Sequence, residues 1–334
     1  MLVATIGAIL IVVSLSRYIL KPNVRTSDNE PVSIFIPTGS TYSDVKNLLF
    51  GRGLIINRRS FEWVAGRKNY QGLIKPGHYI LKGSMSNNEL INMLRSGAQT
   101  PIDLVFNNIR KKEELAGKIS KQIEADSLSL LKCWNDREFL KSLNTAPEKI
   151  MIIFIPNTYE LWWTTDAYEF TERMYKEYRK FWDGERAQKA ASTRLSSEEV
   201  IILASIIEKE TQKNDEKPSI AGVYINRLRK DWPLQADPTV VFAWGDFEMK
   251  RVLTVHTKID SPYNTYIYRG LPPGPICIPS IASIDAVLNY KNHDYMFFCA
   301  RADMSGYHSF SRTLAEHNRH AKAYQNALNE RKIL

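Results

Sequence analysis

The sequence predicts an α+β protein in which an N-terminal membrane anchor precedes a small α/β module and a larger mixed α+β domain. Three observations support this prediction: an apolar run opens the chain, short alternating strands and helices follow it, and an almost wholly apolar helix lies in the second half. The chain has 334 residues, of which 44% are hydrophobic and 11% aromatic. A chain of this size and composition can bury a sizeable core and is expected to form two or more domains.

Residues 1–20 are expected to form a single transmembrane anchor. Leu2–Leu15 is almost unbroken in apolar residues, and Tyr18–Leu20 extends the run past a short polar break. The run is short against the roughly 20 residues that a membrane-spanning helix needs. A cleaved signal peptide has a similar apolar core, but the sequence has no basic start and no small-residue cleavage site, so an anchor is favoured. Residues 21–31 are polar and turn-rich and are expected to form a tether.

Residues 32–106 are expected to form the small module. Val32–Pro37 alternates apolar and polar residues, which predicts a short strand, and His78–Leu81 predicts a second one. Helical patterns and a further strand complete the module; these are Ser43–Phe50, Ser60–Gly66, Ser86–Leu94 and the strand Ile102–Phe106.

Residues 107–334 are expected to form the larger domain. The segment Met151–Trp163, MIIFIPNTYELWW, is apolar enough to predict a strand that enters an aromatic loop. Tyr159, Trp162 and Trp163 of that loop could stack on sugar, but core packing is the simpler expectation. The other predicted helices are Lys111–Ala125, Arg137–Leu143, Ala167–Trp182 and Thr313–Leu328.

The segment Val200–Thr211, VIILASIIEKET, runs from an apolar helix into two carboxylates. A helix that is apolar on every side must be enclosed by other protein, and burial raises the pKa of a carboxyl group toward the range of a general acid. Glu208 and Glu210 are two residues apart and point to roughly opposite sides, so they are not a catalytic pair. A polar run after Glu210 indicates a cleft, whereas Glu208 could be held by a backbone group or an arginine. The alternative is that both simply mark a helix end.

Three segments dense in turn formers follow this helix: Leu234–Val240 (LQADPTV), Ser261–Tyr266 (SPYNTY) and Arg269–Ser280 (RGLPPGPICIPS). The prolines and glycines of the third predict a stiff loop. Gln235, Tyr263, Asn264 and Tyr266 offer aromatic faces for sugar rings and amide groups for hydroxyls and acetamides. On composition alone, a buried structural loop with self-satisfied polar groups is an equal alternative.

Together these motifs resemble the MltG, or YceG-like, family of endolytic murein transglycosylases. The resemblance rests on IIEKET, NRL, LQxDPTV, YNTY, GLPPGPI and a late HSFSxTLAEHN, in this order, and it is stronger in the second half of the chain. The family implies a membrane-anchored enzyme that cuts peptidoglycan glycan strands between N-acetylmuramic acid and N-acetylglucosamine and leaves a 1,6-anhydromuramoyl end. The strand–helix–helix–strand order over Ser33–Leu81 is similar to the LysM-like region of this family, so residues 32–106 are assigned to a LysM-like module that either holds glycan or serves as scaffold. Residues 107–334 are assigned to the catalytic domain.

In the family the catalytic Glu is followed directly by Thr, which corresponds to Glu210 here. One carboxyl group can protonate the glycosidic oxygen and then, as a carboxylate, take the proton from the muramic 6-hydroxyl as that oxygen closes on the anomeric carbon. No water is consumed, so no second carboxylate is needed to activate one. Ordinary glycosidases use two flanking acids, and Asp237 and Asp260 leave a hydrolase interpretation open.

The supporting residues follow from the same resemblance. Gln235, Tyr263, Asn264 and Tyr266 match family motif positions and are expected to contact sugar or to orient the acid and the oxocarbenium-like transition state. Asp237 is expected instead to cap the helix that begins with DPTVVFAW.

Composition limits the remaining function classes. The net charge of +9 suggests nucleic acid binding, but the basic residues are dispersed and no nucleic-acid motif appears, so no such partner is expected. The six histidines, His308 and His317 included, lack short ligand spacing, so neither a metal nor a cofactor is expected. Three widely spaced cysteines argue against a disulfide framework, and Cys277 and Cys299 are expected to be small core residues.

The expected partners are peptidoglycan glycan strands and the membrane, and the family alone implies peptidoglycan synthases. The expected location is the inner cell membrane, crossed once, with the catalytic domain on the extracytoplasmic side, where the enzyme would end glycan strand elongation. Arg17, Lys21 and Arg25 follow the apolar run, which by the positive-inside rule would place the C-terminal bulk in the cytoplasm. Either the native start lies upstream of Met1 and is basic, or translocation of a large domain overrides this bias. The rival function is a non-catalytic glycan-binding scaffold of the cell envelope.

Overall fold

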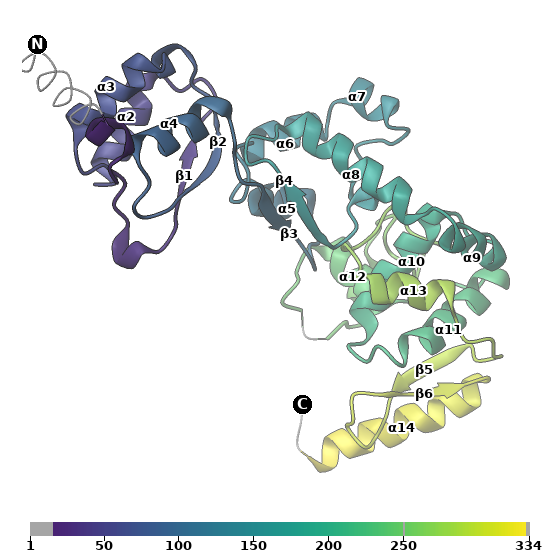
Figure 1. The fold of residues 1–334 in the computed structure, drawn as a ribbon. Coiled ribbons are helices and arrows are strands. Elements are labelled where there is room, and N and C mark those ends of the chain that lie inside the picture. The colour runs from purple at the N-terminus through teal and green to yellow at the C-terminus, as the bar shows by residue number, and fades with distance from the viewer. Residues whose placement is uncertain (1–15, 250, 332–334) are drawn as a thin grey trace, which may run out of the picture. The chain divides into compact units, whose positions relative to one another are not determined.

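The computed structural model of the chain describes residues 16–249 and 251–331 (Figure 1). Most of the predicted anchor at residues 1–20 lies outside this range. Within the described range, no helix combines the length and the apolar character needed to span a membrane. The described chain divides into two compact units, the first formed by residues 16–104, 119–126 and 158–166, and the second by residues 105–118, 127–157 and 167–331.

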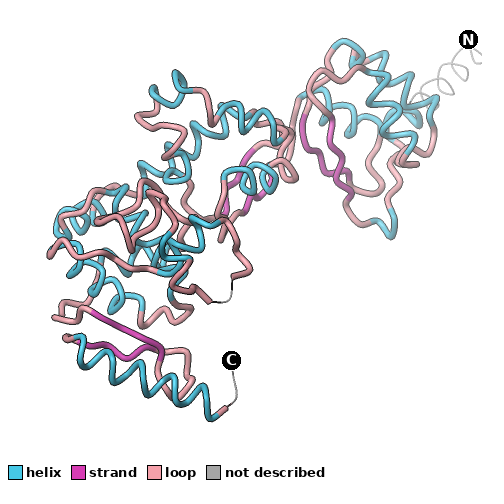
Figure 2. The backbone as a smooth tube through the Cα atoms, turned by 180° about the vertical axis from the view of Figure 1, so that it is seen from behind, coloured by secondary structure: helices cyan, strands magenta, loops and turns pink. Residues whose placement is uncertain are grey.

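The fold is mixed α+β, as predicted. The described strands form two-stranded sheets, β1 with β2, β3 with β4 and β5 with β6, set among many helices (Figure 2). Because no large sheet forms within residues 16–249 and 251–331, the cores there are built mainly by helix packing.

The first unit forms around the antiparallel pair of β1 (Val32–Ile36) and β2 (Gly77–Leu81), in which Ile34 lies opposite Tyr79. Its helices cover this pair, and Ile34, Leu49 and Leu90 are fully buried. Both strands were predicted from the sequence; β1 alternates exposed and buried residues, whereas β2 is buried almost throughout. The other elements of this region are η1 (Ser27–Asn29), α2 (Tyr42–Gly51), α3 (Arg58–Arg67), η2 (Tyr70–Gly72) and α4 (Asn87–Ser96).

Part of the expected tether belongs to this unit instead. Val24 is 2% exposed and packs in the core, and Asn23 Nδ2 donates to Asn87 Oδ1 at 2.7 Å. Polar, turn-rich composition did not reveal these contacts, because they depend on residues more than 60 positions away.

The strand predicted in Met151–Trp163 begins later than expected. Ile150–Ile153 is a 3₁₀ helix, η3, and the strand β4 (Thr158–Leu161) pairs with β3 (Ile102–Val105). The isoleucines of η3 are buried without alternation, whereas β4 alternates exposed and buried residues. A short apolar run does not distinguish a buried turn from a strand, whereas the alternation of β4 does. The predicted helix Lys111–Ala125 likewise ends early, as α5 (Lys112–Ile119).

The second unit is built around α10 (Ser197–Glu210). Its residues Val200–Ile207 are all buried, as the apolar sequence predicts, and the helix packs against α11 (Lys217–Arg229) and α13 (Ile281–Leu288) (Figure 1). The proline-rich loop crosses this helix: Ile276, Cys277 and Ile278 are buried, and the Ile276 amide donates to Ser205 Oγ at 3.0 Å. This loop therefore belongs to the core of the second unit.

A C-terminal layer completes the second unit. β5 (Phe297–Ala300) and β6 (His308–Ser311) pair antiparallel, and α14 (Leu314–Glu330) packs along both strands (Figures 1 and 2). The remaining elements are α6 (Ser127–Cys133), α7 (Arg137–Ser142), α8 (Ala167–Phe181), α9 (Glu185–Thr193), α12 (Asp237–Trp244) and η4 (His256–Lys258).

Two smaller sequence expectations are only partly correct. All three cysteines are free thiols, as their spacing predicts, but Cys299 is half-buried on β5 and is not a core residue like Cys277. Tyr159 is buried, whereas Trp162 is 50% exposed because it lies on the alternate face of the chain there.

Gly222→Ala should destabilise the second unit by about 2–3 kcal/mol, because an added methyl group overpacks a filled site. A Cβ at this position would overlap the Lys291 carbonyl oxygen and lie 2.7 Å from His293 Nε2. Denaturant unfolding measures the effect. The matched control is Gly117→Ala in α5, where nothing lies within 4 Å of the added carbon and alanine should stabilise the helix by up to ~1 kcal/mol. Equal effects from both substitutions would contradict the packing at Gly222.

Candidate active site

Glu210 occupies the point at which the enclosed helix ends. It is the last residue of α10, and Thr211 turns the backbone into an extended conformation, with φ −146° and ψ 147°. The Glu210 side chain is half-buried, and the hydroxyl of Tyr224 on α11 donates to its Oε1 at 2.5 Å. The carboxyl group is thus held by one donor at the edge of the core.

Glu210 lies in a hollow of about 320 Å³. The hollow is bounded by the end of α10, by α11, by the start of α12, by β5 and by α14. Its polar lining consists of Glu210, Tyr224, Arg227, Gln235, Asp237, Tyr266 and His317. Its apolar lining consists of Leu234, Phe297, Phe298 and Leu314.

The surroundings of Glu210 raise its pKa to about 7. Burial is the main cause, and the negative charge of Asp237 adds to it. The Tyr224 hydrogen bond and the positive charge of Arg227 act in the opposite direction but do not cancel the effect. Near neutral pH the group therefore exists in both protonation states and can either donate or accept a proton.

Asp237 does not cap α12, contrary to the sequence prediction. The helix begins at Asp237 as expected, but the N-cap residue is Ala236, and no side chain caps this helix. The Asp237 carboxylate turns to the hollow instead, where Tyr266 donates its hydroxyl to Oδ1 at 2.5 Å. Burial raises the pKa of Tyr266, so this hydroxyl keeps its proton and serves as a donor.

Gln235 reaches the hollow from a left-handed backbone conformation. Its φ is 49°, which costs a non-glycine residue about 1 kcal/mol or more and is concentrated at functional sites. The strain is held by its neighbours: Leu234 and Ala236 are fully buried, and the Gln235 amide donates to the Thr265 carbonyl at 3.0 Å.

The structure brings Glu210, Gln235 and Tyr266 together but places Asn264 and Tyr263 elsewhere. Asn264 is fully buried; its Nδ2 donates to the carbonyls of Thr257 and Ile259, and its Oδ1 accepts from the Tyr266 amide at 3.0 Å. Asn264 therefore shapes the loop that presents Tyr266. Tyr263 packs against Phe242 with the two rings tilted by 47° and their centroids 4.8 Å apart, and it lines a different hollow.

Sequence reasoning assigned no role to two residues of α11 that line the hollow. Tyr224 and Arg227 are one helical turn apart, so they share a face. The buried Arg227 guanidinium donates from Nε to the Met296 carbonyl at 2.8 Å and from Nη1 to the Leu234 carbonyl at 2.6 Å, which fixes two walls of the hollow. Arg227 belongs to the NRL motif, and the three-residue spacing between Tyr224 and Arg227 is the pattern from which their shared helix face could have been predicted.

His317 also lines the hollow without having been predicted to do so. It lies on α14 and stacks on Phe297, with ring centroids 5.4 Å apart, and burial lowers its pKa. No group of three or more His, Cys, Asp or Glu side chains among the described residues is arranged to hold a metal ion.

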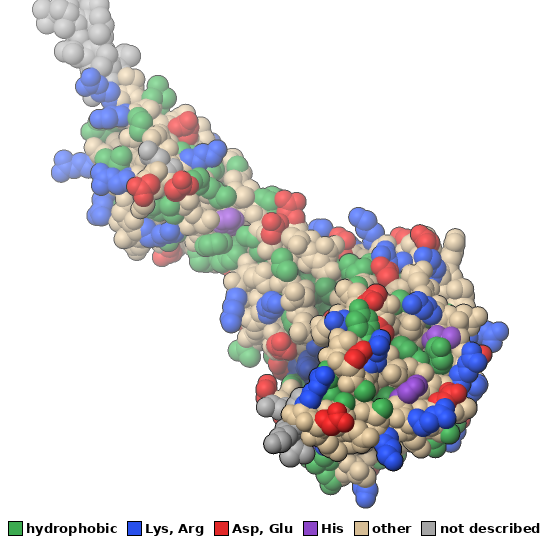
Figure 3. Space-filling model, turned by 90° about the horizontal axis from the view of Figure 1, so that it is seen from below, with side chains coloured by type: hydrophobic (Ala, Val, Ile, Leu, Met, Phe, Trp, Pro, Cys, Tyr) green, Lys and Arg blue, Asp and Glu red, His purple; other side chains and the backbone are tan. Residues whose placement is uncertain are grey.

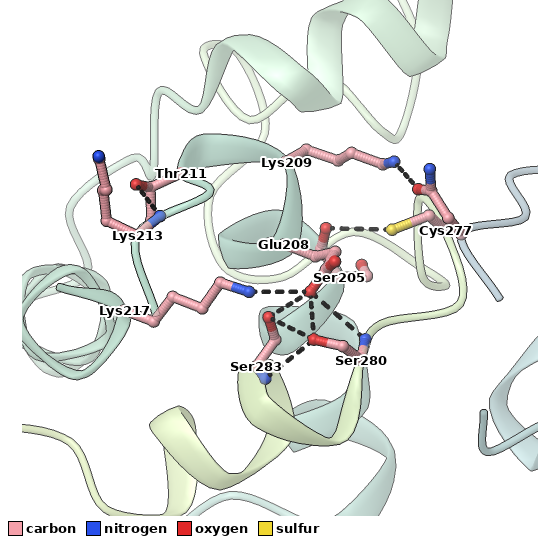
Figure 4. A network of polar contacts seen from close by, with 10 residues as sticks. Ser205, Glu208, Lys209, Thr211, Lys213, Lys217, Cys277, Ser280 and Ser283 are labelled. Atoms are coloured by element: carbon pink, nitrogen blue, oxygen red, sulfur yellow. Dashed lines mark hydrogen bonds and ion pairs between the residues drawn. The ribbon is translucent and has the colours of Figure 1, made fainter. Parts of the chain in front are cut away.

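Glu208 has the opposite environment to Glu210, as Figure 4 shows. Its Oε2 accepts from the hydroxyls of Ser280 and Ser283, at 2.6 and 2.5 Å, and lies 3.2 Å from Lys217 Nζ. Burial alone would raise the pKa of Glu208, but the two hydroxyls and the ammonium group outweigh it, so the pKa is lowered. Glu208 is therefore ionised, and its carboxylate links α10 to Lys217 of α11 and to Ser280 and Ser283 at the start of α13. The sequence anticipated that it would be held, but not by serines and a lysine.

Comparison with known proteins agrees with the family resemblance. The chain matches the YceG-like family over residues 34–323 and belongs to that family. It is 28% identical over 331 residues to a Bacillus subtilis (strain 168) protein named endolytic murein transglycosylase, covering 94% of this chain and 90% of that one. A protein of the same name from Streptococcus pneumoniae serotype 2 is 27% identical over 309 residues, and the match covers 83% of this chain but 55% of that one.

A solved structure is also similar to this chain. The crystal structure of a yceG-like protein from Listeria monocytogenes has a TM-score of 0.59 and 30% sequence identity, and the match covers 87% of this chain and 98% of that one.

Glu208→Gln should lower the free energy of unfolding by about 3 kcal/mol, because it leaves the buried Lys217 ammonium without its counter-charge. The matched control is Glu172→Gln on the exposed face of α8, for which a change within about 0.5 kcal/mol is expected. Denaturant unfolding measures both variants.

The difference in unfolding free energy between wild type and Glu208→Gln should also depend on pH. Because the folded-state pKa of Glu208 is lowered, its contribution is present above the ordinary value of 4.5 and is lost as the pH falls through the folded pKa. The stability difference between wild type and Glu208→Gln should therefore narrow on acidification below this value. If the stability difference between the two proteins stayed constant from neutral to acid pH, Glu208 would not be the ionised partner of Lys217 that the structure shows.

Proposed function

We propose that this protein is an endolytic peptidoglycan lytic transglycosylase that cleaves between N-acetylmuramic acid and N-acetylglucosamine and forms 1,6-anhydromuramoyl ends. The observation that carries the proposal is one carboxyl group, Glu210, whose pKa is raised to about 7 inside a polar hollow. Family membership and relatives named endolytic murein transglycosylase support the same chemistry.

Protonated Glu210 donates its proton to the glycosidic oxygen as the bond to the muramic anomeric carbon breaks. The leaving N-acetylglucosamine keeps that proton on its 4-hydroxyl group. The Tyr224 hydroxyl, which donates to Oε1, stabilises the carboxylate that forms. This carboxylate then takes the proton of the muramic 6-hydroxyl as its oxygen bonds to the anomeric carbon, so Glu210 ends the cycle protonated.

The neighbouring groups take supporting roles in this proposal. The Asp237 carboxylate, oriented by Tyr266, stabilises positive charge on the sugar as the bond breaks. Gln235 and Tyr266 contact the sugars, whereas Asn264 positions Tyr266 through its backbone amide. Tyr263 contacts the substrate beyond the cleaved bond. Asp260 accepts from the Tyr268 hydroxyl at 2.7 Å and does not line the hollow, so it takes no part.

The membrane and module assignments belong to the same proposal. We infer that residues 1–20 anchor the protein once in the cell membrane, with the catalytic domain on the extracytoplasmic side, where it would end glycan strand elongation beside peptidoglycan synthases. Residues 32–106 form a LysM-like module. A stacked pair supports glycan binding there: Phe35 is 40% exposed and lies on His78, with ring centroids 4.7 Å apart.

The full-length protein in detergent should release anhydro-ended internal fragments from polymeric peptidoglycan, and Glu210→Gln should release none, because an amide cannot transfer the proton. Mass spectrometry of the products measures whether anhydro-ended fragments form with each protein. Reducing ends from the wild type would mean hydrolysis, and Asp237→Asn would then show whether Asp237 activates water. Binding of the strands without cleavage would support the glycan-binding scaffold instead.

The cleavage rate should fall as the pH rises through about 7, since the first step needs protonated Glu210. The Tyr224 hydrogen bond lowers the pKa of Glu210, so Tyr224→Phe should move this limb of the pH profile to higher pH, together with a roughly tenfold loss of kcat from the lost stabilisation. The matched control is Tyr268→Phe, which removes a hydroxyl outside the hollow and should leave the profile in place. A limb that moves to lower pH in Tyr224→Phe would contradict the proposed role.

A further inference from the structure

One further hollow shares Glu210 and Asp237 with the active site, and a second hollow shares Arg110 with the first; both have several basic side chains in their lining. The first, of about 360 Å³, is lined by Glu210 and Asp237 of the active site and by the basic residues Arg110, Lys209 and Arg251. The second, of about 590 Å³, is also lined by Arg110 and adds Lys111, Lys112 and Arg137, together with the acidic residues Glu113 and Glu148. We call these two hollows, with Arg110, Lys111, Lys112 and Lys209, the basic groove.

These four cations have no carboxylate at ion-pair distance among the described residues. Lys112 Nζ bonds the Asn135 amide oxygen at 2.7 Å, and Lys209 Nζ bonds that of Asn108. Arg137, which lines the second hollow, is already paired with Glu148 at 2.9 Å. On the face shown in Figure 3, basic and acidic side chains are interspersed.

An aromatic ring holds part of this cluster together. The Arg110 guanidinium lies 4.4 Å from the centroid of the Phe247 ring, and Lys111 Nζ lies 5.2 Å from it. Cation–π attraction to this ring offsets some of the repulsion between the two charges. The remaining repulsion is relieved when an anion enters the groove.

We propose that the basic groove binds the carboxylates of the peptide stems on the glycan strand, so that the enzyme prefers peptide-bearing strands to denuded ones. The inference rests on the proposed function. The N-acetylated sugars carry no charge, and in an intact strand the lactyl carboxylate of the muramic acid is consumed in the amide bond to the peptide. The free carboxylates of the peptide are therefore the anions that lie beside the cleaved bond.

The shape and lining of the groove favour a peptide over the diphosphate of a lipid-linked strand end. The cations are spread over two hollows, whereas a diphosphate is compact. Apolar side chains lie between them, namely Phe247 in the first hollow and Met151, Phe242 and Tyr263 in the second, and these suit the methyl and methylene groups of a peptide stem. This placement also gives Tyr263 a role in substrate binding away from Glu210.

The test compares one preparation of released glycan strands before and after an amidase has removed the stems, with full-length protein in detergent. The wild type should show a kcat/KM at least about tenfold higher for peptide-bearing strands, or ~1.4 kcal/mol. Added salt should reduce this preference because it screens exposed charges.

Reversing the charge of two lysines in the basic groove tests whether the groove causes the preference for peptide-bearing strands. Lys111→Glu with Lys112→Glu should lower kcat/KM for peptide-bearing strands by about tenfold, mainly through KM, and should affect denuded strands much less. The matched control is Lys176→Glu with Lys180→Glu on the exposed face of α8, which makes the same change in net charge and should leave the preference intact. Binding can be measured without cleavage in the Glu210→Gln variant. Its affinity for peptide-bearing and for denuded strands is compared with and without the Lys111→Glu and Lys112→Glu substitutions.

Equal wild-type rates on both kinds of strand, with anhydro ends still formed, would overturn the inference and leave the proposed function standing. A preference that depends on a carrier diphosphate at the strand end, tested with strands polymerised from the lipid-linked precursor, would overturn it in favour of phosphate binding. No cleavage of either strand by the wild type would contradict the proposed function and the inference with it.

Discussion

The site depends on the burial of the middle of α10, residues Val200–Ile207. Residues Val200–Ile207 are enclosed on all sides, and the helix delivers Glu210 to the point where that enclosure ends. A pKa raised from 4.5 to about 7 means that ionising this carboxyl group costs roughly 3 kcal/mol more than in water. That cost is comparable to the gain from fully burying one or two aliphatic side chains of the same helix. The fold can therefore hold a destabilised acid because the helix that carries it is so well packed.

Two carboxylates on this helix have opposite properties because their neighbours differ. Glu208 meets two hydroxyls and the Lys217 ammonium, which favour its charged form, whereas Glu210 meets one hydroxyl and the like charge of Asp237. Helix α11 serves both: Lys217 at its start pairs with Glu208, and Tyr224 further along donates to Glu210. A shift of α11 would therefore disturb both the Glu208–Lys217 ion pair and the hydrogen bond from Tyr224 to Glu210. The close approach at Gly222 restricts such a shift.

Local patterns in the sequence predicted the α+β class, the strands β1 and β2 and the enclosed helix: β1 alternates along its length, and α10 contains an apolar run long enough for a buried helix. These patterns failed at Ile150–Ile153, where a short apolar run does not distinguish a buried turn from a strand. Within the site, the apolar run before a polar end offered Glu208 and Glu210 as candidates, and the family resemblance, in which the catalytic Glu directly precedes Thr, selected Glu210. Tyr224 was missed because its apolar neighbours on α11 make it look like a core residue. Asn264 shows the reverse case, since composition cannot tell an amide that faces a ligand from one whose hydrogen bonds are used within its own loop.

The geometry of Asp237 bears on whether water takes part in the reaction. A hydrolase needs a carboxylate that is free to take a proton from a water molecule on the face opposite the acid. Asp237 lines the same hollow as Glu210, but the Tyr266 hydroxyl already occupies its Oδ1 at 2.5 Å. The buried loop amide of Asn264 fixes the backbone that presents Tyr266, so this contact is part of the fold. An oriented, hydrogen-bonded carboxylate suits electrostatic stabilisation of the sugar cation better than proton abstraction. In the proposed mechanism, therefore, one acid poised near neutral pH and a neighbouring carboxylate held in this way leave ring closure to the substrate's own hydroxyl and not to water.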